Sequence, residues 1–405
     1  MNRKVPASRS LFAAFLLALP LALLARPDGR DQVALAPTAD QTTISRMVYG
    51  ALSDSRLAYR PRPADEALSG DIFRRYIESL DGNRQFFTAA DIARFDPYRY
   101  QLGEAVRKGD PAAAFAMFAV YRERVEQRVA YARKLLEKGD FDFSGDQRWD
   151  YDREDAPWAT NAAELDALWR KSVMNDWLRL KIAGKQPAEI RRTLDKRYAQ
   201  LSRSVNELKS EDVFALFLNA YTSSVDPHTD YLNPRSAENF NQSMSLSLEG
   251  IGAQLQRQDD FVVIREIIPG GPASLDGTLK AGDRIVGVGQ GKSGVIEDVV
   301  GWRIDDVVAR IRGDKGTQVK LEYIPAEGGI DGEHRSVTLT RARVQLAEQA
   351  AKGKTYTIPA KGDTPERLIG VIELPTFYQD FEGRRRNGND YTSATRDVSR
   401  LLGEF

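Results

Sequence analysis

Residues 245–289, SLSLEGIGAQLQRQDDFVVIREIIPGGPASLDGTLKAGDRIVGVG, are the most informative stretch of this chain. They join a loop of alternating glycine and apolar residues, Gly250 to Ala253, to an apolar run, a GGPA turn and a run led by AGD. Because glycine carries no side chain, successive backbone N–H groups of such a loop can converge on an anion. An extended peptide can pair with the strand that follows and place its terminal carboxylate in the loop. The stretch therefore predicts a unit that binds protein C-termini.

The predicted carboxylate-binding residues are Gly250, Ile251, Gly252 and Ala253, which act through their backbone. A larger set of mainly aliphatic residues, near the loop and on a later helix, is predicted to supply the peptide-pairing strand or a side-chain pocket. That set is Leu246, Leu248, Gln254, Leu255, Val307, Val308 and Ile311. Each aliphatic residue fits a place in the core of the same unit equally well, and a β-bulge is the alternative for the two glycines.

Composition and charge exclude several classes of function. The 405 residues include 58 basic and 58 acidic side chains without a long basic run, so nucleic acid is not predicted as a partner. There is no cysteine, which excludes thiol nucleophiles, disulfides and Cys-ligated zinc. Only His228 and His334 supply imidazole, so no metal site and no cofactor are predicted. His228 is expected to close the turn that joins the helical domain to the first strand, and His334 is expected to be exposed without a role.

The N-terminus has the pattern of a bacterial export signal. Arg3, Lys4 and Arg9 precede the apolar run of residues 11–25, which is too short to span a bilayer of about 30 Å comfortably. We expect a signal peptide over residues 1–25, with cleavage as late as residue 36, and a periplasmic protein. An uncleaved signal that keeps the protein at the membrane surface is the alternative.

Residues 40–235 are predicted to form a helical domain. Apolar residues recur at helical spacing along two stripes, and Asn161, Pro187 and Ser210 mark helix starts. The stripes are Phe115, Phe118, Val125, Val129, Ala132 and Leu136, and then Leu165, Trp169, Val173, Trp177 and Leu180. Between them, residues 140–158 are polar and acidic, and a solvated surface loop is a better interpretation than a calcium site because the EF-hand spacing is absent.

Beyond Asn233 the apolar period changes to two, which predicts strands. Several short strands and one helix near residues 302–311 predict a compact β-rich domain over residues 244–343. Residues 368–374 (LIGVIEL) are predicted to form a buried strand, and residues 392–402 an amphipathic helix. The fold class is therefore multidomain α+β.

Particular strings give the chain a family resemblance. The order of loop, strand and turn in residues 245–289 resembles a PDZ domain. The strings LDGNRQFF (80–87), DPHTDYL (226–232) and IGVIELPTFY (369–378), with VGVG (286–289) and GWR (301–303), resemble the tail-specific, or C-terminal processing, proteases of bacterial periplasms. The resemblance covers about residues 40–405.

The resemblance implies a serine endopeptidase with a Ser–Lys dyad that acts on proteins with apolar C-termini, sometimes with an adaptor protein. It also implies that residues 344–405 are the incomplete start of an α/β protease core, so we expect residues from about 345 onward to pack poorly or to need a partner. Within residues 1–405 no serine is followed three residues later by lysine, and neither GxSxG nor Gly-Gly-Gly occurs. We therefore assign no catalytic residue and expect this chain alone to be inactive. A non-catalytic PDZ-type binder or decoy of C-terminal tails is the alternative function.

Overall fold

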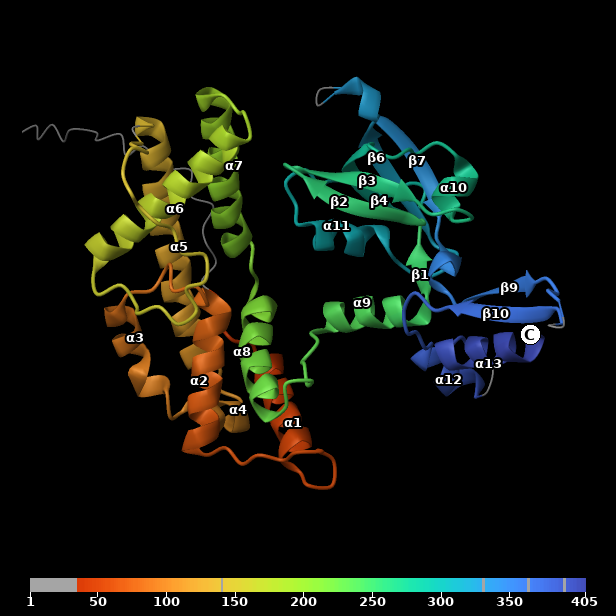
Figure 1. The fold of residues 1–405 in the computed structure, drawn as a ribbon, viewed down its shortest axis with the longest axis horizontal. Helices are drawn as coiled ribbons and strands as arrows, with labels where there is room; N and C mark the ends of the chain where they lie inside the picture. Colours follow the sequence, from red (N-terminus) through yellow and green to blue (C-terminus); the bar gives the residue numbers. More distant parts are fainter. Residues whose placement is uncertain (1–34, 140, 330–331, 363–364, 389–390) are drawn as a thin grey trace, which may run out of the picture.

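The computed structural model describes residues 35–139, 141–329, 332–362, 365–388 and 391–405, so the predicted export signal lies outside the described residues. Helices α1 to α8 form one body, and a β-rich unit and a hairpin with two helices lie to its side (Figure 1). Three separate clusters of buried apolar residues correspond to these parts. Within the described ranges, none of the helices combines the length and the apolar character needed to cross a bilayer.

The helical region packs around one large apolar core. Its helices are α1 Ala39–Ser53, α2 Glu66–Asp81, α3 Ala89–Phe95, α4 Leu102–Lys108, α5 Ala112–Lys138, α6 Ala162–Ile182, α7 Pro187–Asn206 and α8 Ser210–Val225, with a short 3-10 helix at Asp96–Tyr98. The predicted stripe on α5 is buried throughout, and that on α6 is buried except for the half-buried Leu180. The starts predicted at Pro187 and Ser210 are confirmed, and Asn161 caps α6 by accepting the Glu164 N–H.

The LDGNRQFF string has a structural explanation. Asp81, at the end of α2, is buried, and its carboxylate accepts backbone N–H groups from Gln85, Phe86 and Phe87 at 2.7–2.8 Å. Burial raises the pKa of Asp81, although these three bonds act in the opposite direction. The turn that follows α2 is thus closed by one carboxylate.

Helix α9, Pro234–Ser245, corrects the expectation that extended structure begins after Asn233. Asn233 accepts the N–H of Ser236, and Pro234 occupies the first helical turn, both of which are start signals. Ala237, Phe240 and Met244 recur at helical spacing on α9, but none of the α9 residues is buried. The prediction of strands overlooked this short pattern of three- and four-residue intervals, which is typical of a helix.

The β-rich unit contains a five-strand path in the order β2-β3-β4-β6-β7, with β5 paired to β4. Its elements are β1 Ser247–Gly250, β2 Ala253–Gln258, β3 Phe261–Ile267, α10 Pro272–Asp276, β4 Arg284–Gln290, β5 Glu297–Asp298, α11 Ile304–Ile311, β6 Gln318–Ile324, β7 Arg335–Thr340 and β8 Ala342–Gln345. All pairs are antiparallel, and β1 pairs separately with β8. Strand β2 lies at the edge of the sheet. The predicted α+β class is confirmed.

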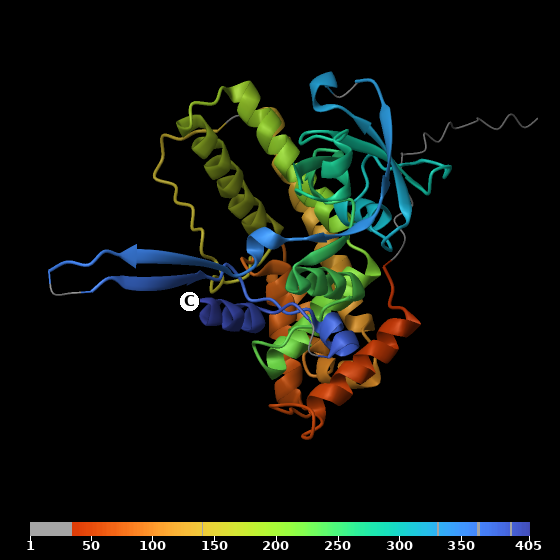
Figure 2. The same cartoon turned by 90° about the vertical axis from the view of Figure 1, so that its right-hand side faces the viewer.

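The C-terminal part contains β9 Lys352–Ile358, β10 Arg367–Glu373, α12 Phe381–Asn387 and α13 Ala394–Glu404. Strand β10 forms as predicted but is not buried, because Leu368 is 60% exposed and Val371 is 42% exposed, which agrees with the poor packing expected from about residue 345 onward. It pairs only with β9, and the hairpin projects from the molecule (Figure 2). Because no layer of the described chain covers a face of this ribbon along most of its length, its apolar side chains stay in contact with solvent.

Candidate peptide-binding site

The loop between β1 and β2 requires glycine at its centre. Gly252 has φ +74, and a Cβ atom built on it would lie 2.9 Å from the Cα of Gly271. A Cβ on Gly271 would lie 3.0 Å from the Cα of Gly252. The backbones of the glycine loop and of the GGPA turn therefore touch, which explains why both segments contain glycine.

The carbonyl groups of the loop are anchored, whereas two of its N–H groups are not. Ile251 and Gly252 accept hydrogen bonds through their carbonyls from the N–H groups of Ala273 and Ile268, at 2.8 and 2.9 Å. Among the residues that the structure describes, none accepts a hydrogen bond from the N–H of Ile251 or of Gly252. Both residues are buried. Two adjacent backbone N–H groups without an acceptor can donate to one anion, so the loop is a candidate anion-binding site.

Strand β2 continues directly from the loop along the edge of the sheet. It pairs with β3 on one side, with a register shift between Gln254 and Leu255, and α11 contacts it. Gln254 is exposed, whereas Leu255 is half-buried against the core of the unit. The free edge of β2 therefore presents backbone donors and acceptors next to the candidate anion-binding loop.

A cavity of about 510 Å³ lies between α11 and α9. Ile304, Val308 and Arg312, at intervals of four residues, line it from the α11 side, and Glu238 and Asn239 are among its residues on α9. The volume is within the range of small-ligand sites, and the two aliphatic residues provide apolar surface.

The structure separates the aliphatic residues that the sequence grouped together. Val307 and Ile311 are buried in the core of the β-rich unit, and Ile251 belongs to the same core. Leu246 packs elsewhere, in the C-terminal cluster that includes Tyr378. Leu248 is half-buried, and one of its methyl groups lies 3.9 Å from a Cβ position built on Gly250. Of the predicted pocket residues, only Val308 lines the cavity between the two helices.

Sequence reasoning missed three contributors to this site. Ile304 and Arg312 share the face of Val308, and their spacing of four residues was a readable signal once the helix had been placed. Helix α9 carried a similar signal in the spacing of Ala237, Phe240 and Met244, which the prediction of strands overlooked.

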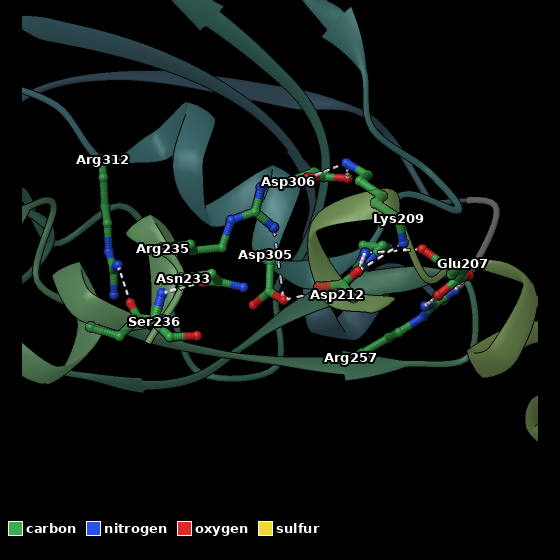
Figure 3. A network of polar contacts seen from close by, with 12 residues as sticks. Glu207, Lys209, Asp212, Asn233, Arg235, Ser236, Arg257, Asp305, Asp306 and Arg312 are labelled. Carbon is green, nitrogen blue, oxygen red and sulfur yellow. Dashed lines mark hydrogen bonds and ion pairs between the residues drawn. The ribbon is translucent and has the colours of Figure 1, made fainter. Parts of the chain in front are cut away.

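Ion pairs connect both walls of the site to the helical region (Figure 3). The guanidinium of Arg257 on β2 makes two hydrogen bonds to the Glu207 carboxylate, at 2.7 and 3.0 Å, and these bonds raise the pKa of Arg257. Arg303, which precedes α11, donates to the Glu207 carbonyl at 2.9 Å and to Asp212 at 2.7 Å. The short segment between α7 and α8 therefore holds the strand and the helix at once.

Further pairs extend this contact. Asp306 on α11 accepts from Lys209 at 2.8 Å and from Arg235 of α9 at 3.1 Å. The turn between β2 and β3 contributes Asp259, which pairs with Lys196 at 3.3 Å, and Asp260, which pairs with Arg203. We call the ion pairs that join α7, α8 and their linker to the β-rich unit the interdomain ion pairs. They are Lys196–Asp259, Arg203–Asp260, Glu207–Arg257, Lys209–Asp306 and Asp212–Arg303.

The two histidines lie outside the candidate site. His228 is exposed in the turn after α8, where its backbone N–H and its ring contact Asp226 at 2.8 and 3.1 Å. This turn joins α8 to α9, not to the first strand as expected. His334 is exposed, and its Nδ1 lies 2.9 Å from Glu322.

Comparisons with known families match two parts of the chain. Residues 52–235 match the model of the tail-specific protease N-terminal domain, and residues 241–324 match the model of the PDZ domain. The second match includes the C-terminal end of α9, the glycine loop, β2 and α11.

The most similar curated relatives include two bacterial proteases. The tail-specific protease of Haemophilus influenzae is 41% identical over 345 residues, which are 85% of this chain and 46% of the relative. The carboxy-terminal processing protease CtpA of Bacillus subtilis is 37% identical over 187 residues, which are 45% of this chain and 35% of the relative. This chain thus spans less than half the length of either relative.

Solved structures of similar proteins include two proteases. The PDZ domain of a carboxy-terminal protease from Vibrio cholerae, determined in complex with a peptide, is 51% identical and aligns over its full length with 25% of this chain, at a TM-score of 0.24. The photosystem II D1 C-terminal processing protease is 20% identical over 50% of this chain and 51% of its own, also at a TM-score of 0.24. Because both scores are low, the fold described above stands on this chain's own structure.

Proposed function

Since this chain carries the N-terminal domain and the PDZ domain of the tail-specific protease family, we propose that it recognises protein substrates by their apolar C-termini. The substrate's last residues would pair with the free edge of β2, and the terminal carboxylate would lie in the loop of Gly250, Ile251, Gly252 and Ala253. This is recognition by strand addition.

One observation carries the proposal: the N–H groups of Ile251 and Gly252 have no acceptor among the described residues, and they immediately precede an edge strand. A C-terminal carboxylate satisfies both features, because it supplies an anion at the end of an extended chain. An internal peptide segment would leave the two N–H groups without a charged partner.

The preference for apolar side chains is supported by Ile304 and Val308 on the cavity wall. A side chain from the end of the peptide would bury its apolar surface there, at about 25 cal/mol for each Å² removed from water.

The chemical step that we propose for the whole protein is peptide hydrolysis by a serine endopeptidase with a Ser–Lys dyad, acting in the periplasm. The names of the relatives and the apolar N-terminal run support this part. No residue of the present chain is assigned to the dyad. The chain's own part in the proposal is the capture of the substrate.

The test is a pair of fluorescein-labelled decapeptides that end in valine, one with a free carboxylate and one with a carboxamide. Fluorescence anisotropy with the purified chain should show binding of the acid at least about tenfold tighter than that of the amide, as expected for loss of a charge-assisted contact. Equal affinities would contradict the carboxylate loop.

A variant of the loop provides the structural control. Gly252→Ala places a Cβ against Gly271 in a backbone with φ +74, so it should abolish the preference for the acid. Gly277→Ala is the matched control, because Gly277 also has positive φ but no atom within 4 Å of its Cβ position. It should retain the preference.

A further inference from the structure

Arg312 stands at the junction of the glycine loop, α11 and α9. It follows α11 directly, and its backbone N–H bonds to the carbonyl of Val308 at 2.9 Å. The Cγ of Arg312 lies 3.9 Å from a Cβ position built on Gly250, so its aliphatic stem passes over the start of the glycine loop. The side chain lines the cavity against α9 and a second cavity of about 520 Å³ beside β1 and α12.

Arg312 differs from the neighbouring arginines in having no carboxylate partner among the described residues. Arg235, Arg257 and Arg303 each form an ion pair with a carboxylate. In the described part of the chain, the guanidinium of Arg312 donates instead to a neutral acceptor, the Oδ1 of Asn239 on α9, at 2.7 Å. A guanidinium carries five N–H donors, so most of its hydrogen-bonding capacity is open.

The environment of Arg312 favours an anionic partner for the unused N–H donors of its guanidinium. Arg312 is half-buried, and burial lowers its pKa, although Glu238 and Asp305 act in the opposite direction from beyond ion-pair distance. A partly desolvated guanidinium without a counter-ion is unfavourable, and an incoming carboxylate relieves it with two parallel hydrogen bonds.

We propose that Arg312 is a specificity-determining residue of the peptide site, which donates from its guanidinium to the terminal carboxylate of the bound chain together with the N–H groups of Ile251 and Gly252. In the free protein Asn239 holds the guanidinium, and the peptide takes over that bond. The inference rests on the proposed function and adds to it a positively charged side chain. Arg312 follows α11, and Asn239 of α9 competes with the peptide for its guanidinium.

The test combines the acid and amide decapeptides with three variants of the purified chain. Arg312→Gln should weaken binding of the acid about tenfold and leave binding of the amide unchanged, because only the acid carries the partner of the guanidinium. Arg310→Gln is the matched control, since Arg310 lies two residues away on the same helix, pairs with Glu297 at 3.0 Å, and points to the other side. It should change neither affinity.

Asn239→Asp tests the same contact without altering the arginine. Asn239 is exposed, so the substitution leaves packing intact, and its new carboxylate should compete with the peptide and weaken binding of the acid several-fold. The amide should bind as before.

The outcomes separate the inference from its premise. If the unmodified chain binds acid and amide equally, the proposed carboxylate loop is wrong and the role of Arg312 falls with it. If the unmodified chain prefers the acid and Arg312→Gln keeps that preference, only the role of Arg312 is wrong. Equal weakening of acid and amide by Arg312→Gln would also contradict it, because it would mark a structural contribution.

Discussion

The core of the helical region and its contact with the β-rich unit are built from opposite kinds of interaction. In the core, aromatic and aliphatic side chains exclude water; Tyr76 and Phe217, both fully buried, meet edge to face with ring centroids 5.9 Å apart. Across the contact, the interactions are the interdomain ion pairs, such as Arg257 with Glu207 and Lys209 with Asp306. The first kind depends little on salt or pH, and the second depends on both.

The helical core and its contact with the β-rich unit therefore have different structural roles. Apolar burial makes the helical region a stable body whose shape does not depend on conditions. Ion pairs with partial exposure contribute little net energy and lose it readily, so they set an orientation without making it permanent. Because they hold both β2 and α11, a change in this contact reaches the peptide site from both walls.

The largest effect is expected from the core. Phe217→Ala removes a fully buried ring from the contact between α8 and α2 and should destabilise the helical region by about 3–5 kcal/mol. Urea denaturation followed by circular dichroism measures this change. A loss below about 1 kcal/mol would mean that the site collapses without a cavity.

An intermediate effect is expected from the best-formed interdomain pair. Glu207 and Arg257 are 24% and 17% exposed, and a double-mutant cycle with Glu207→Gln and Arg257→Gln should give a coupling of about 1–2 kcal/mol. Peptide binding is a suitable readout for the cycle, because Arg257 lies on β2.

The orientation itself can be followed with spin labels, since the chain has no native cysteine. Labels at Lys134→Cys on α5 and Lys315→Cys beyond α11, both exposed, report the distance between the two units. Glu207→Gln should broaden that distance distribution, while the urea midpoint of the helical core stays unchanged. A distribution that stays narrow, also in about 1 M salt where the Debye length is about 3 Å, would show that ion pairs do not set the orientation.

The smallest effect concerns acid. Burial tends to raise the pKa of Asp306, but Lys209 and Arg235 outweigh it and hold that pKa below its ordinary value. A carboxyl group with a lowered pKa stabilises the contact above its unfolded pKa of about 3.9, and that contribution disappears as the pH falls through the lower folded value. The contribution is therefore constant from pH 5 to 7.

The same spin-label pair provides the measurement. Below about pH 4 the distance distribution should broaden, and Asp306→Asn should remove this part of the acid response. If the distance distribution of the Asp306→Asn variant broadens with acid as much as that of the unmodified chain, the response belongs to other carboxylates.

The helices of the core were predicted and α9 was not, because their apolar stripes differ in length. Val125, Val129 and Trp169 are buried, so selection of apolar residues at helical spacing leaves a long visible stripe. On α9 the apolar residues Ala237, Phe240 and Met244 keep helical spacing over a short run, and none of them is buried. Its other contacts with neighbours, such as those of Arg235 and Asn239, are polar, and its remaining local signal was the Asn233-Pro234 start.

Strand β10 shows the complementary limit. The run LIGVIEL correctly predicted an extended segment, because aliphatic and β-branched side chains favour strands. Burial of that strand was not a property of the run itself. It depends on a second layer, and in the described structure β9 supplies a pairing edge while most of both faces stays open.

The sequence by itself determined the glycine loop and its edge strand, because the left-handed backbone of Gly252 and the close approach of Gly271 are local demands that only glycine meets. It also determined that a helical part precedes a β-rich part, because the spacing of apolar residues changes from the helical period to a period of two along the chain. The tertiary structure alone decided which side chains meet at the loop. Val307 and Val308 are neighbours in sequence, yet one is in the core and the other lines the cavity. Arg312 acquires its significance from α9, which is distant in sequence, because the position and the counter-charge of a side chain depend on everything packed around it.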